Sequence, residues 1–134
     1  MKIEELRIND IYKCKTDDTN TIRFVSELNS RGEVVLNKVG GESWESIEAT
    51  IQDVIPVEVN DNSLKLIGAI KNPFGAEYII MIDNKEFYIK HDINSPLWIC
   101  ARLHKYRPPF VKFKFMHELQ RYLLDNYMTV LKVI

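Results

Sequence analysis

Apolar side chains recur at every second residue through most of this chain, and at every third or fourth residue only near its end. In residues 21–28, Ile22, Phe24 and Leu28 share one face of an extended chain while the charged Arg23 takes the other. This is the pattern of a strand with one buried face. The chain is therefore expected to be mainly sheet, with a late helix.

Turn residues divide the first 59 residues into short strands. Asn29-Ser30-Arg31-Gly32 suits a tight reversal into a strand at 34–36, because glycine adopts positive φ without strain. Gly40-Gly41 breaks the chain again, and a further strand at 44–49 precedes a one-turn segment at 50–53 and a last strand at 55–57. Four or five short strands of this kind favour a small SH3-like β-barrel, whose closure hides the sheet edges.

The remaining residues predict a short helix, an antiparallel sheet and a covering helix. Asn60-Asp61-Asn62-Ser63 supplies capping side chains for a helix that ends at Gly68. Strands are expected at 77–82 and 86–91 as a hairpin, then at 97–103, 110–113 and 129–134. One helical stripe is formed by Met116, Leu119, Leu123 and Tyr127, which predicts a helix over 115–127.

The predicted fold class is thus α+β, with a β-barrel-like subdomain at residues 1–59 and a sheet-and-helix subdomain at 60–134. The 134 residues suit one domain or two small ones, so the two parts can also form one continuous domain.

The composition is that of an ordinary globular protein, and the cytoplasm is the expected location. The longest apolar run, residues 78–82, is far shorter than the roughly 20 residues that a membrane-spanning helix needs, so no membrane partner is expected. Acids stand where a signal peptide would have its apolar stretch, at Glu4 and Glu5, which argues against export. Cys14 and Cys100 are expected to be reduced and packed in the core.

Three stretches, residues 2–10, 55–68 and 115–120, occur in the same order in another group of proteins. They resemble short uncharacterised proteins of prophages and phages of gut bacteria. The chain departs from that group at Val57-Glu58-Val59, where a second proline is usual, and at Asn126-Tyr127, where the last helix usually ends at glycine. The resemblance implies a fold layout and a mobile-element setting. It supplies no functional residue.

No catalytic or metal-binding motif is complete. His117-Glu118 begins the pattern of a helical zinc protease, but the second histidine is replaced by Arg121, which repels a cation. Cys100 and His104 share a strand face without the paired ligands that structural zinc sites use. The sequences Ser43-Trp44-Glu45-Ser46 and Asn94-Ser95-Pro96 both lack the Gly-x-Ser-x-Gly pattern that exposes a nucleophilic serine on a sharp turn. We therefore expect no cofactor, no metal and no enzymatic activity.

The sharpest functional signal is a basic segment with interleaved aromatics. Between Ile93 and Met116 there is no acid, and the candidate nucleic-acid contacts are Arg102, Lys105, Tyr106, Arg107, Lys112 and Lys114. Cations that neutralise phosphates beside aromatics that stack bases are typical of single-strand binding surfaces. The alternative is that the aromatics are core and the lysines guard a sheet edge.

Charge is also distributed unevenly along the chain. Residues 1–67 carry 8 Lys/Arg and 13 Asp/Glu, whereas residues 68–134 carry 10 and 6. The two halves either attract one another or present a basic face to an anionic partner.

Three function classes remain open. The first is a non-catalytic binding or accessory module that contacts an unidentified protein, with Trp44 and Trp98 as candidate contact residues because large aromatics dominate interface energies. The second is a nucleic-acid-binding accessory protein that uses residues 102–114. The third is an enzyme with a site assembled from dispersed residues. No oligomeric state follows from the sequence.

Overall fold

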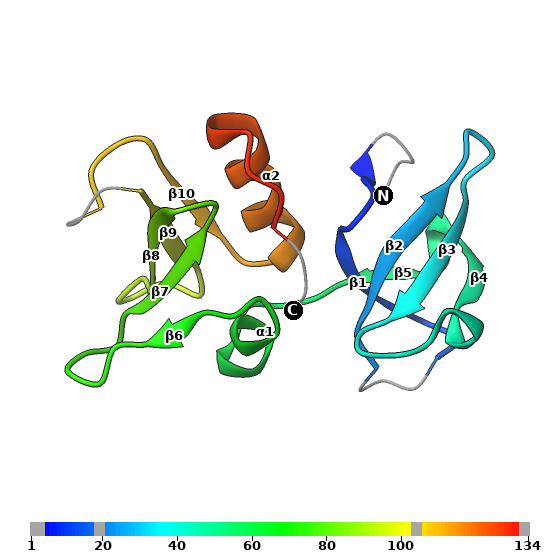
Figure 1. Cartoon of the computed structure of the whole chain (residues 1–134), viewed down its shortest axis with the longest axis horizontal. Helices are drawn as coiled ribbons and strands as arrows, with labels where there is room; N and C mark the ends of the chain where they lie inside the picture. Colours follow the sequence, from blue (N-terminus) through cyan, green and yellow to red (C-terminus); the bar gives the residue numbers. More distant parts are fainter. Residues whose placement is uncertain (1–4, 18–20, 103–105, 132–134) are drawn as a thin grey trace. The chain divides into compact units, whose positions relative to one another are not determined.

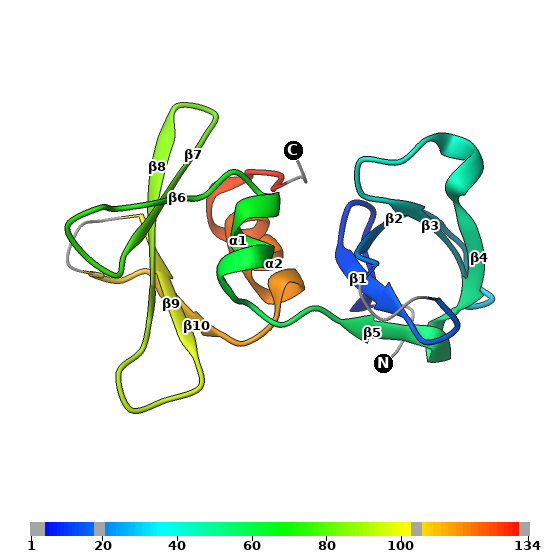
Figure 2. The same cartoon turned by 90° about the horizontal axis from the view of Figure 1, so that it is seen from below.

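The computed structural model describes residues 5–17, 21–102 and 106–131. The chain divides into two compact units, residues 1–57 and 58–134. Each unit contains one five-stranded antiparallel sheet, and a helix follows the second sheet (Figures 1 and 2). The predicted α+β class is confirmed.

The sheet of unit 1 has the strand order β4-β3-β2-β1-β5. The strands are β1 (Ile11–Cys14), β2 (Arg23–Leu28), β3 (Glu33–Lys38), β4 (Ile47–Thr50) and β5 (Val54–Pro56), with one-turn 3-10 segments η2 (Ser43–Glu45) and η3 (Ile51–Asp53) on either side of β4. The predicted reversal at residues 29–32 is confirmed, and Gly32 has a φ of 81°. The strand expected at 44–49 begins only at Ile47, because η2 occupies its first residues.

The prediction of which β2 side chains face the core is wrong. Val25 is fully buried and Phe24 only half-buried, although the period-two pattern places Phe24 on the buried face. The cause is a β-bulge between Val25 and Glu27, which brings Val25 and Leu28 onto the same face of the sheet. A bulge shifts the alternation by one residue, so the pattern fails at that point.

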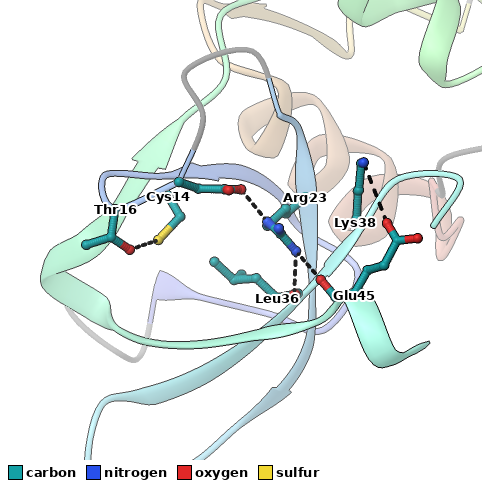
Figure 3. A network of polar contacts seen from close by, with 7 residues as sticks. Cys14, Thr16, Arg23, Leu36, Lys38 and Glu45 are labelled. Carbon is teal, nitrogen blue, oxygen red and sulfur yellow. Dashed lines mark hydrogen bonds and ion pairs between the residues drawn. The ribbon is translucent and has the colours of Figure 1, made fainter. Parts of the chain in front are cut away.

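Arg23 lies inside unit 1, where its guanidinium donates three hydrogen bonds (Figure 3). Its residue is only 5% exposed. Nε donates to the Asp17 carboxylate at 2.6 Å, and Nη1 donates to the carbonyls of Leu36 at 3.2 Å and Glu45 at 2.8 Å. The guanidinium therefore ties β2 to β3 and η2, with a carboxylate compensating its buried charge.

Unit 2 consists of two helices and a sheet with the strand order β10-β9-β8-β7-β6. The elements are α1 (Asp61–Leu66), β6 (Ile70–Lys71), β7 (Tyr78–Ile82), β8 (Lys85–His91), β9 (Trp98–Ala101), β10 (Phe110–Phe113) and α2 (Met116–Tyr127). The Asn60 side chain accepts a hydrogen bond from the Ser63 amide at 2.9 Å, and Gly68 has a φ of 82°, so both predicted ends of the short helix are confirmed. Asp83 and Asn84 both have positive φ, as the predicted hairpin turn requires.

Helix α2 buries its predicted stripe on one face of this sheet. Met116, Leu119 and Leu123 are fully buried, and the Tyr127 ring meets the fully buried Phe87 ring edge-on at 5.2 Å. The strand expected at 129–134 is wrong for Thr129–Leu131, while 132–134 lie outside the described residues. Met128 turns into the left-handed region, and the Thr129 amide then donates to the Leu123 carbonyl at 3.1 Å. The backbone of this segment bonds back to the helix instead of pairing with a strand, and the Lys85 ammonium of β8 donates to the Thr129 hydroxyl at 3.5 Å.

Neither described helix is long and apolar enough to cross a membrane.

We expect Arg23→Ala to destabilise unit 1 by about 3 kcal/mol, because it removes the hydrogen bonds that the guanidinium donates to the Leu36 and Glu45 carbonyls and to the Asp17 carboxylate. Arg23→Lys should recover less than half of the lost free energy of unfolding, since one ammonium cannot replace the planar array of donors of a guanidinium. Urea unfolding followed by hydrogen exchange of the β2 and β3 amides measures the change. Arg31→Ala, at an exposed turn arginine, is the control. Equal stability of the Arg23→Ala and Arg31→Ala variants would contradict the assignment.

The pH dependence of unit 2 should reveal the hydrogen bond from the Tyr78 hydroxyl to the Asp61 carboxylate. This bond, together with burial, raises the pKa of Tyr78 from 10.0 to about 12. A raised folded-state pKa stabilises the fold below pH 10, and that stability is lost as the pH rises to about 12. Urea unfolding across this window should therefore show a steeper loss for the wild type than for Tyr78→Phe. If the stability of the wild type and of Tyr78→Phe fell in parallel with pH, the hydrogen bond between Tyr78 and Asp61 would not be the cause of the loss.

Candidate binding surfaces of the second sheet

The sheet of unit 2 has one face under α1 and α2 and an opposite face, here called the outer face, on which neither helix lies (Figure 2). The strand register places one row of side chains across all five strands on the outer face: Phe110, Ala101, Tyr88, Ile79 and Ile70. Phe110 is 44% exposed and Ile70 74% exposed, whereas Ala101 is fully buried. Apolar surface is thus accessible at both edges of the sheet.

Tyr106 is held by contacts within the protein. Its hydroxyl donates to the Glu77 carboxylate at 2.7 Å, and the Lys90 ammonium lies 4.5 Å from its ring centre. Burial, and then the hydrogen bond to Glu77, raises the pKa of Tyr106. Its φ of 55° fixes the backbone in the left-handed region. A tyrosine engaged in this way is poorly placed to stack on a base.

The structure separates the predicted cations. Arg102 donates to the Glu86 carbonyl at 3.0 Å and lies 5.9 Å from the ring of the buried Phe87, so it points away from the outer face. Arg107 is exposed, and Lys105 lies outside the described residues.

The other two predicted cations, Lys112 and Lys114, lie on and just after β10. Each is about half exposed, and they form ion pairs with Asp92 at 3.5 Å and Glu58 at 3.8 Å. Exposed pairs of this kind contribute little, so both lysines can exchange these partners for another anion.

The two predicted contact tryptophans differ in exposure. Trp98 is half-buried on β9, where its ring meets His91 at 5.3 Å and Tyr78 at 6.1 Å. Trp44 is 79% exposed in η2 of unit 1. Phe74 and Ile93, which the sequence did not single out, are 97% and 81% exposed.

A groove runs between β10 and α2. Among the described strands, β10 pairs only with β9, so Phe110–Phe113 form an edge of the sheet, whereas the Lys114 carbonyl that follows accepts from the Val59 amide at 2.9 Å and Phe115 bridges to Glu58. Helix α2 packs against β10. The groove between them measures about 470 Å³ and is lined by Phe110 and Val111 of β10 and by Glu118, Arg121, Tyr122 and Asn126 of α2. The Tyr122 hydroxyl donates to the Pro109 carbonyl at 2.9 Å and fixes the start of β10 beside the helix.

Four of the acidic residues of the first half of the chain lie on one groove of unit 1. This groove measures about 520 Å³ and lies over β2, β3 and β4. Its lining includes Glu27, Glu33, Glu48 and Asp53. In the strand register, Val35 lies between Glu27 and Glu48 on the outward face of this sheet. Sequence reasoning missed this gathering because it depends on the register of three strands.

The histidines and cysteines do not converge within the described ranges, and no group of three or more His, Cys, Asp or Glu side chains there is placed to hold a metal ion. Cys100 is fully buried, and burial raises the pKa of its thiol, which favours the unreactive protonated form. His117 stacks on Phe115 at the start of α2, and His104 lies outside the described residues.

Comparison of the chain with protein families, characterised proteins and solved structures gave no match.

Proposed function

We propose that this protein is a non-catalytic binding module that takes an extended segment of a partner protein along β10. The observation that carries the proposal is the groove between an edge strand and a packed helix, lined by Val111 on one side and Tyr122 on the other. An edge strand offers unpaired backbone donors and acceptors to an added strand, and pockets beside it select alternate side chains of that strand. The groove supplies such a pocket.

Charge along this edge favours an acidic partner segment. Lys112 and Lys114 follow one another at alternate positions, Arg107 precedes them, and the stretch from Ile93 to Met116 contains no acid. A lysine on an edge strand repels the same edge of another copy while it attracts a strand that carries carboxylates. The partner segment should therefore alternate acidic side chains with apolar ones that fill the groove.

The rest of the chain fits an accessory role. We propose a place in a mobile element, which the resemblance to short phage and prophage proteins supports, and a site of action in the cytoplasm, which the acids at Glu4 and Glu5 support. We propose that unit 1 is a small SH3-like barrel, since its strand order β4-β3-β2-β1-β5 and the 3-10 turn before β5 support that topology.

A synthetic peptide in which glutamate alternates with isoleucine tests the groove. In nuclear magnetic resonance titrations, its addition should shift the amide signals of β10 and α2. Asn126→Trp fills the groove and should weaken binding at least about tenfold, a change of roughly 1.4 kcal/mol. Lys65→Trp places the same side chain at an exposed position of α1 and should leave binding unchanged. Equal binding by the two variants, or shifts confined to other strands, would refute the proposed site.

Nucleic acid is the second candidate, because Phe110 is 44% exposed on the same edge as Lys112. Fluorescent single-stranded oligothymidine provides the test. We expect no measurable binding at physiological salt, since Tyr106 is engaged and Arg102 points elsewhere. Tight binding that falls steeply with salt, and that is lost when Arg107 and Lys112 are both changed to glutamine, would favour this candidate over the protein partner.

A further inference from the structure

The opposite edge of the same sheet, at β6, carries three exposed apolar side chains that lie in or beside a groove. Ile70 is 74% exposed, Met81 62% and Phe74 97%. Phe74 lies in the turn between β6 and β7. Its amide donates to the Asn72 side chain at 3.0 Å, and the Gly75 amide donates to the Asn72 carbonyl at 3.2 Å. These hydrogen bonds hold the backbone of the turn, and the Phe74 ring projects from it into solvent.

A groove of about 550 Å³ lies beside this turn. Its apolar lining comes from Ile70, Pro73, Ile79 and Met81, and Lys71 and Glu86 add one charge of each sign. Phe74 does not fill this groove, since the ring is almost completely exposed. A well-formed apolar groove of this volume is large enough for an aromatic side chain.

We propose that the occupant is a second copy of this chain, related by a two-fold axis, so that Phe74 of each copy enters the groove of the other. A two-fold interface uses the same patch on both copies, and it must therefore be complementary to itself. This patch contains both a protruding aromatic ring and an apolar groove. It also contains opposite charges, since Lys71, whose ammonium lies 6.0 Å from the Tyr78 ring centre, and Glu86, which accepts from the Tyr88 hydroxyl at 3.1 Å, both line the groove. In the proposed dimer, Lys71 of one copy turns from the Tyr78 ring to Glu86 of the other.

Two features favour insertion of side chains over extension of the sheet. Strand β6 has only two residues, and one of them is a lysine, which discourages edge-to-edge pairing. The backbone of the turn that presents Phe74 is ordered by its own hydrogen bonds, so little backbone freedom is lost on docking. The patch is small compared with the roughly 800 Å² that each partner buries in a standard interface. The dimer is therefore weak and reversible.

Sedimentation velocity on the full chain tests the dimer, from about 1 μM to about 1 mM, a range that covers weak association. The weight-average mass should rise with concentration toward twice the monomer mass. Phe74→Ser should weaken association at least about thirtyfold, as expected for an aromatic that dominates an interface. Ile93→Ser removes another exposed apolar side chain, 81% exposed in a different turn of unit 2, and should associate like the wild type.

Exchanging the charges of Lys71 and Glu86 tests whether these two side chains pair across the proposed dimer. Lys71→Glu and Glu86→Lys should each weaken association about threefold, and the double variant should restore it, because the two charges then face one another again. A wild type that stays monomeric throughout the concentration range would overturn the proposal. So would a dimer that Phe74→Ser leaves unchanged, or a double variant weaker than either single one. Binding of the acidic peptide to β10 is measured separately.

Discussion

The burial of one face of the second sheet under α2 is the interaction on which the rest of unit 2 depends. Phe87, Ile89 and Phe113 are fully buried on that face, as is Met116 of the helix. In the described strand order β10 and β6 each have one neighbouring strand, so this sheet keeps two edges as well as an outer face that neither helix covers. Any function of unit 2 that uses its sheet must operate at those remaining surfaces, and both grooves described above lie there.

The two edges are built differently, and this difference suits the different occupants proposed for them. At β10, Lys112 is half exposed and the groove has a helix as its second wall, which suits an extended acidic segment. At β6 the strand is only two residues long, and the surface is formed by Ile70 and a turn that projects Phe74. A long added strand has little to pair with there, whereas a single aromatic side chain has a groove to enter. Both edges can therefore be occupied at once.

Local signals in the sequence were sufficient for most elements. Capping by Asn60, the positive φ of Gly68 and the stripe of α2 each depend on residues within one or two turns of chain. The failures have a different origin. The buried guanidinium of Arg23 and the hydroxyl of Tyr106 are bonded to groups that lie elsewhere in the sequence, Glu45 and Glu77. Periodicity carries no information about such pairs, and so it could not show that Arg102 and Lys112 lie on different sides of the sheet.

Exposure alone does not distinguish a binding residue from a solvated one. Trp44, Phe74 and Ile93 are all at least 79% exposed. Trp44 and Phe74 are the stronger candidates for an interface, because large aromatic side chains contribute most of the binding energy in many interfaces. Trp44 and Ile93 line none of the three grooves described here, whereas Phe74 directly follows Pro73 of the β6 groove. An apolar side chain on one copy needs a concave apolar surface on its partner, and a self-complementary patch needs both in one place. Phe74 meets this condition, which a search of the sequence for aromatics alone would not have revealed.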